Sequence, residues 1–165
     1  MRVFLAFTLT NSSINDIIKK QEYIKDLNIN LVKKENIHLT LFFFGDIEES
    51  KIKDIIEIIK KNKFQKFELS GTKLIYLPNY KKVSVLALKF ESNELIDNLI
   101  NKYDKEILNL GFKRDKKFLP HITIARVKKE IPVIKYEENM KINIDNIKLN
   151  ELRRIKFSKL IKIDE

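Results

Sequence analysis

The order of elements along this chain repeats once, and each copy ends in a strand that carries a histidine and a threonine. Alternating apolar residues predict a strand over residues 2–9, helical spacing of isoleucines follows, and a His-x-Thr segment occupies residues 37–41. The same order returns in the second half, where the second His-x-Thr segment occupies residues 120–124. Two strand–helix–strand units in one chain favour an α+β domain with two similar lobes.

The two motif segments contain the only histidines of the chain, His38 and His121, each followed two positions later by Thr40 or Thr123. Side chains alternate between the faces of a strand, so each histidine shares a face with its threonine and the apolar residues between them point into a core. With five threonines among 165 residues, this offset arises twice by chance with a probability of about one in a thousand. We therefore interpret the pair as functional.

Periodicity and turn residues predict the other elements. We expect helices over residues 13–27, 48–61 and 93–110, with Asn11, Ser12 or Ser13 capping the first and Gly111 ending the third. The expected strands cover residues 2–9, 37–44, 67–77 (one or two, interrupted at Gly71), 83–90, 120–127, 141–149 and 155–163, with a short extended piece at residues 31–32. Residues 1–165 then form one domain, with approximate repeats over residues 1–80 and 81–165.

The charge balance favours a polyanionic partner. Lysine and arginine total 33 against 23 aspartates and glutamates, a formal net charge of +10. Nucleic acid is the commonest partner of such a chain, although a general richness in Lys, Ile and Asn is an alternative explanation. The absence of cysteine excludes disulfides and thiolate metal sites. The apolar run at the amino terminus stops at Leu9, too early for a signal peptide, so we expect a cytoplasmic protein without membrane contact.

An approximate two-fold axis between the two lobes would bring the motif strands to a shared cleft, with one imidazole on each side. This arrangement suits the hydrolysis of a phosphodiester. The attacking water must lose a proton on one side of phosphorus, and the leaving oxygen must gain one on the other. Histidine can do either near neutral pH, because its ordinary pKa is about 6.5. Thr40 and Thr123 can donate hydrogen bonds to the non-bridging phosphate oxygens. A metal would need a carboxylate from elsewhere as a third ligand, and we expect no metal and no cofactor.

The motifs and their flanks resemble the 2H phosphoesterases, and within them the RNA 2′,3′-cyclic phosphodiesterases, historically called 2′-5′ RNA ligases. The similarity covers nearly the whole chain and is carried by residues 2–6, 35–45 and 118–126. It implies two pseudo-symmetric lobes of antiparallel sheet, with outer helices, around a central cleft. It also implies opening of a 2′,3′-cyclic phosphate at an RNA end to leave a 2′-phosphate. Leu31, Lys34 and Asn150 depart from the residues common in the family.

The resemblance assigns His38 as the proton donor and His121 as the proton acceptor. Arg126, which follows the second motif, is a further candidate for binding phosphate. Strict alternation would put Arg126 on the face opposite His121, so this role needs a twist or a bulge at the strand's end.

Three phenylalanines are candidates for contacting the substrate. Phe42 has the same parity as His38 and Thr40, so it can line the cleft and stack on a base, or else pack beneath the other lobe. The same two interpretations apply to Phe7 and Phe118.

Three alternative functions are compatible with the same motif residues or with the same net positive charge. The reverse reaction would ligate RNA ends through a 2′-5′ bond, and the same chemistry could act on another cyclic nucleotide. A non-catalytic module that binds a nucleotide or RNA end belongs to another class, and the intact histidines and threonines argue against it. We expect a monomer whose partner is RNA with a 2′,3′-cyclic phosphate end, with tRNA as one source of such ends.

Overall fold

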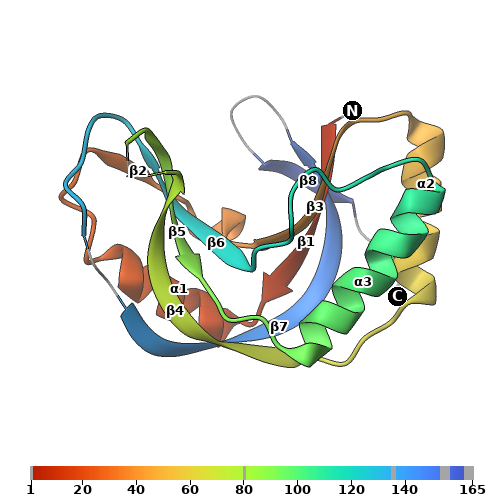
Figure 1. Ribbon diagram of the computed structural model, residues 1–165, viewed down its shortest axis with the longest axis horizontal. Coiled ribbons are helices and arrows are strands. Elements are labelled where there is room, and N and C mark those ends of the chain that lie inside the picture. Colours follow the sequence, from red (N-terminus) through yellow and green to blue (C-terminus); the bar gives the residue numbers. More distant parts are fainter. Residues whose placement is uncertain (1, 80, 135–136, 153–156, 162–165) are drawn as a thin grey trace.

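The strands of the protein form one curled antiparallel sheet with helices outside it (Figure 1). This computed structural model describes residues 2–79, 81–134, 137–152 and 157–161. The elements in chain order are β1 (Arg2–Leu9), α1 (Asn11–Gln21), β2 (Ile29–Leu31), a 3-10 turn (Lys34–Asn36), β3 (Leu39–Asp46), α2 (Glu49–Lys61), β4 (Phe67–Pro78), β5 (Val83–Lys89), α3 (Glu94–Asn109), β6 (His121–Val127), β7 (Glu137–Leu152) and β8 (Phe157–Ile161). The α+β class predicted from the sequence is confirmed.

The order of the strands explains how the two motifs meet. The sheet runs β2-β6-β5-β4-β7-β1-β3, with β8 added beside β7, and every pair is antiparallel. The motif strands β6 and β3 therefore lie near opposite edges of this path. They nevertheless contact each other, because the sheet curls strongly about β4 and β7 (Figure 1). The curl therefore brings the two motif strands together, as the resemblance implies.

The helices pack outside the sheet, each beside strands from the other part of the chain. α1 packs against β6, and the buried side chain of Gln21 at its end donates hydrogen bonds to the carbonyl oxygens of Val32 and Ile124. α3 lies beside α2, near β1 and β3 (Figure 1), where the Tyr103 hydroxyl donates to the Asn62 carbonyl. The two copies of strand, helix and motif strand are thus intertwined. Their description as lobes of one domain stays a prediction.

Several element boundaries differ from those predicted. β3 begins at Leu39, just after His38, where we expected residue 37, and β7 covers Glu137–Leu152, where we expected residues 141–149. Residues 155–156 and 162–163 of the last predicted strand lie outside the described ranges.

The first helix begins at Asn11 and ends at Gln21, where we expected residues 13–27. Its cap is Thr10, whose hydroxyl oxygen accepts from the Ser13 amide. After Gln21 the chain continues in tight turns with hydrogen bonds three residues apart. β4 is one strand that passes Gly71, whose φ of 78° accommodates a register shift in the pairing with β7.

Candidate active site

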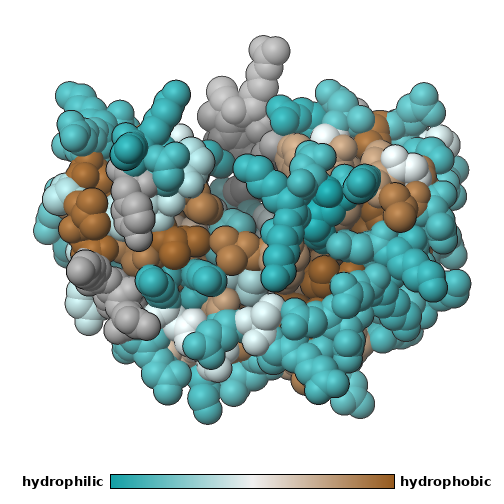
Figure 2. All heavy atoms as spheres, viewed as in Figure 1, coloured by the Kyte–Doolittle hydropathy of each residue, from teal (hydrophilic) through white to brown (hydrophobic). Residues whose placement is uncertain are grey.

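The motif residues alternate between core and cleft as predicted. Leu39 and Leu41 are buried, and so are Ile122 and Ile124 at the equivalent places in β6. The histidines and threonines between and before them are only partly buried. His38 lines a cavity of about 560 Å³, together with side chains from β1, β7 and α1. In the space-filling view, hydrophilic residues cover most of this face, and a band of hydrophobic residues runs across its middle (Figure 2).

Both histidine rings are held in the same way by the chain just before them. Nδ1 of His38 lies 2.6 Å from the carbonyl oxygen of Asn36, and Nδ1 of His121 lies 2.6 Å from that of Leu119. A carbonyl oxygen only accepts, so each Nδ1 carries the hydrogen. In the neutral ring Nε2 is then the basic atom, available to take or give a proton. The Thr40 hydroxyl donates to His38 Nε2 over 3.0 Å.

The environment of His38 favours its neutral form. Burial lowers the pKa of His38, because desolvation penalises the charged imidazolium. The hydrogen bond to the Asn36 carbonyl acts in the opposite direction, and the charge of His121 lowers the pKa further. The charge of His121 thus acts on His38 across the contact between β3 and β6.

A bulge in β3 corrects the prediction for Phe42. Ala6 of β1 lies opposite Thr40, and the next residue, Leu5, lies opposite Phe42, so Leu41 is an extra residue. The bulge reverses the alternation after it. Phe42 consequently turns into the core, where it is 4% exposed. The prediction that Phe42 lines the cleft is therefore wrong.

The same bulge places Phe43 on the face of the motif. Phe43 lies opposite Phe4 of β1, and Phe4 lies two residues from Ala6, so Phe43 shares the face of Thr40. Its side chain is 49% exposed, and the Arg2 guanidinium lies 5.6 Å from its ring centre. Phe43 was not predicted as a candidate, because strict alternation assigns it to the core side.

A matching bulge in β6 re-aims Arg126. Thr123 lies opposite Ala87 and Arg126 lies opposite Val85, with Ile124 as the extra residue between the two registers. Val85 and Ala87 are two positions apart on β5, so Arg126 and Thr123 share one face. Arg126 is exposed there. The bulge on which its predicted role depends is thus present.

The other two candidate aromatics differ from each other. Phe7 is fully buried and packs edge-on against Phe64 and Phe67. Of its two interpretations, packing in the core is therefore the one observed, and a contact with the substrate is contradicted. Phe118 is partly exposed just before the second motif, with the Arg114 guanidinium 5.4 Å from its ring centre. A role for Phe118 in substrate binding stays a prediction.

Several cavity residues were not predicted from the sequence. Beside His38 the cavity is lined by residues that include Phe4, Thr8, Lys148 and Asn150. Phe4 and Thr8 share one face of β1, and Lys148 lies opposite Ala6 on that face. The alternation along the first strand could have predicted Phe4 and Thr8, because it also defines the face of the strand opposite the buried one.

Two further findings concern metal ions and membranes. Within the described ranges, no group of three or more His, Cys, Asp or Glu side chains could hold a metal ion. None of the helices that the structure describes is long and apolar enough to cross a membrane.

Solved structures share this fold closely. The structure of a Thermus thermophilus protein designated TT0787 superposes with a TM-score of 0.84 at 22% identity, covering 98% of this chain and 96% of that one. A structure of Escherichia coli LigT complexed with 3′-AMP has a TM-score of 0.78 at 20% identity, covering 98% of this chain and 95% of that one. At these identities the similarity shows the fold.

Sequence relatives show the family. A protein of Methanocaldococcus jannaschii named RNA 2′,3′-cyclic phosphodiesterase is 35% identical over 130 residues, which cover 78% of this chain and 72% of the relative. A protein of the same name from Thermotoga maritima is 34% identical over 137 residues, covering 78% and 71%. The family model for LigT-like phosphoesterases matches residues 10–85, including the first motif. The chain therefore belongs to the LigT-like phosphoesterases, the 2H phosphoesterase family.

Proposed function

We propose that this protein hydrolyses the 2′,3′-cyclic phosphate at an RNA end and leaves a 2′-phosphate. The observation that carries the proposal is the matched pair of histidines, each with Nδ1–H bound to a carbonyl oxygen so that Nε2 is the working atom. Relatives named RNA 2′,3′-cyclic phosphodiesterase support the substrate class. The net charge of +10 suits an RNA partner.

The reaction needs one proton acceptor and one proton donor. Nε2 of His121 takes a proton from water as the water oxygen forms a bond to phosphorus. The bond between phosphorus and the ribose 3′ oxygen breaks, and Nε2 of His38 gives its proton to that oxygen. The 2′ oxygen keeps the phosphate. Each histidine ends in the other's starting protonation state, so proton exchange with solvent resets the pair.

The assignment of His38 as proton donor and His121 as proton acceptor follows the family resemblance. The pKa of His38 affects whether its ring can act as the donor. In the free protein the lowered pKa makes His38 neutral, which suits a base. A bound cyclic phosphate places a negative charge beside the ring, which raises the pKa and favours the protonated donor. A substrate with an activated leaving group decides the assignment, because it rescues only the variant that lacks the acid.

Three further groups complete the proposed site. Thr40 and Thr123 donate hydrogen bonds to the non-bridging oxygens, and Arg126 adds positive charge from the same face as Thr123. The exposed ring of Phe43 takes the base-stacking role first assigned to Phe42, since base stacking needs an accessible aromatic face. Phe118 is the second aromatic candidate.

We also infer the setting in which the protein works. RNA fragments with cyclic phosphate ends, including those derived from tRNA, are its substrates. It acts as a monomer in the cytoplasm, a compartment compatible with a chain that has no cysteine.

The test incubates the protein, in excess EDTA, with short RNAs that end in a 2′,3′-cyclic phosphate, and identifies products by phosphorus NMR. We expect a 2′-phosphate at full rate, and a loss of at least ~100-fold in His38→Ala and in His121→Ala. Joined strands would indicate a 2′-5′ ligase, and binding without turnover would indicate a non-catalytic module. Activity lost in EDTA and restored by a divalent ion would contradict the two-histidine mechanism.

A further inference from the structure

Two lysines continue the row of side chains that begins at His121. Lys89 of β5 lies directly opposite His121, and Lys73 of β4 lies directly opposite Lys89. Directly opposed residues of antiparallel strands project from the same face. Because strands lie about 4.8 Å apart, the two lysines begin about 5 and 10 Å from His121 across the sheet. The catalytic face is therefore extended by two positive charges.

Both lysines are available to a ligand. Lys73 and Lys89 are exposed and line a cavity of about 350 Å³. Among the residues that the structure describes, neither is in an ion pair. Two acidic residues, Glu91 and Glu138, also line this cavity, and the Glu138 carboxylate is bound by Lys20 of α1. Each lysine thus lies outside any ion pair among the described residues, with Glu91 and Glu138 in the same cavity and Glu137 of β7 as the register partner of Lys73.

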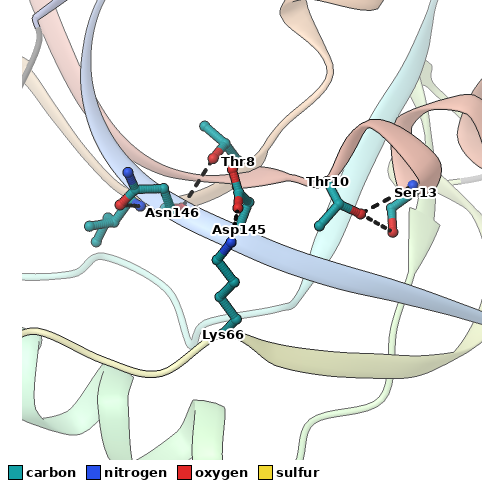
Figure 3. Close-up of polar contacts among 7 residues, drawn as sticks. Thr8, Thr10, Ser13, Lys66, Asp145 and Asn146 are labelled. Carbon is teal, nitrogen blue, oxygen red and sulfur yellow. Dashed lines mark hydrogen bonds and ion pairs between the residues drawn. The ribbon is translucent and has the colours of Figure 1, made fainter.

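The equivalent row on the other motif is neutral. Thr8 of β1 lies beside His38 in the larger cavity, and its Cα partner on β7 is Asn146. The Thr8 hydroxyl is directed at the Asn146 carbonyl oxygen, 3.4 Å away, as Figure 3 shows. Where the first motif has a threonine and an asparagine, the second has two lysines. The two rows of directly opposed residues therefore differ in charge, and the nearest lysine on the face of the first row is Lys148, opposite Ala6.

We propose that Lys89 and Lys73 bind the phosphodiester that precedes the cyclic phosphate, so that the RNA strand leaves the active site across β5 and β4. This inference rests on the proposed function. A mononucleotide cyclic phosphate has no such group and cannot use the lysines. The protein then selects the ends of oligonucleotides over free cyclic mononucleotides, and the charge difference between the two rows sets the direction of the strand.

The test compares kcat/KM for a cyclic mononucleotide, a trinucleotide ending in a 2′,3′-cyclic phosphate, and the same trinucleotide with an uncharged methylphosphonate as its last internucleotide link. The variants are Lys89→Gln and Lys73→Gln, with Lys53→Gln on α2 as a control that removes the same charge outside the cleft. We expect each test variant to lose about 10-fold on the trinucleotide and to change little on the mononucleotide. On the methylphosphonate, wild type should fall to the level of the variants.

The outcomes separate the two proposals. Wild type that hydrolyses all three substrates equally well, or variants that lose the same factor on every substrate, would overturn the lysine site and leave the phosphodiesterase intact. Wild type that hydrolyses none of them would overturn both. If Lys53→Gln lost as much kcat/KM on the trinucleotide as the test variants, the net charge of the protein would explain the effect and the lysine site would be overturned.

Discussion

At the scale of single residues, the two halves of the site differ in one hydrogen bond. The Thr40 hydroxyl donates to Nε2 of His38, and the described residues show no equivalent bond between Thr123 and His121. A hydroxyl can also accept a hydrogen bond, so it can partner the neutral and the protonated ring alike. Thr40 therefore orients the His38 ring in the free protein, and its hydrogen becomes available to the phosphate once Nε2 is protonated.

Removing that hydroxyl should leave the His38 ring positioned by the Asn36 carbonyl alone. In Thr40→Val we expect kcat to fall about 10-fold, because hydrogen bonds to the ring and to the phosphate are both lost. Thr40→Ser, which keeps a hydroxyl, should retain most of the activity. Steady-state kinetics on the cyclic phosphate measure the three proteins, and an unchanged kcat in Thr40→Val would contradict the role.

The neighbours Phe42 and Phe43 provide a second pair of contrasting variants. Phe42→Ala should cost about 3–5 kcal/mol in free energy of unfolding, because it opens a cavity in the core. Phe43→Ala should change stability by less than ~1 kcal/mol and raise KM about 10-fold through loss of base stacking. Urea unfolding and steady-state kinetics measure both effects. If Phe42→Ala instead kept its stability and raised KM, the bulge at Leu41 would be contradicted and β3 would alternate regularly.

At the scale of elements, the bulges explain how much of the site the sequence could predict. Alternation placed His38 and Thr40 correctly, because both precede the extra residue Leu41. It failed one step later at Phe42, since a leucine in a bulge looks no different from a leucine in a regular strand. The bulge arises from the strong curl that the sheet must adopt to bring β3 to β6. That requirement is a property of the assembled sheet, absent from any local pattern.

Helix limits failed for a related reason. Ile24 and Leu27 continue the apolar spacing of the first helix, and both contribute to the core from tight turns after Gln21. Burial requires only that such side chains face inward, which a turn can achieve as well as a helix. The periodicity therefore predicted their burial correctly and their backbone conformation wrongly.

The buried side chain of Gln21 joins α1 to the bulge of β6. The Ile124 carbonyl accepts from the Gln21 amide at 3.0 Å and from the Val32 backbone at 2.9 Å. Gln21→Met should lower the free energy of unfolding by about 1–3 kcal/mol, because the Val32 carbonyl loses the Gln21 donor and the Ile124 carbonyl keeps only the Val32 amide. Gln21→Glu should cost more, since a carboxylate would face two carbonyl oxygens. Urea unfolding checks both, and unchanged stability in Gln21→Met would show that the amide is dispensable.

At the scale of the whole molecule, the net charge of +10 should appear as salt dependence. Each phosphate of single-stranded RNA that a protein neutralises adds about −0.7 to the slope of log affinity against log salt. We expect the slope for an RNA oligonucleotide end to be steeper than that for a cyclic mononucleotide by ~1 or more. Titrations of the two ligands onto His121→Ala over a range of salt measure both slopes. Equal slopes would mean that the excess of lysine reflects the general composition of the chain and not RNA binding.

The position of β7 has a consequence for how the protein is made. β7 lies between β1 and β4, and it is the strand that joins the part of the sheet holding β3 to the part holding β5 and β6. A ribosome delivers β1 and β3 early, but their partner arrives only when residues 137–152 emerge. Contacts this distant along the chain form late and slowly. The two histidines thus remain apart for most of translation, and catalytic competence appears only near the end of synthesis.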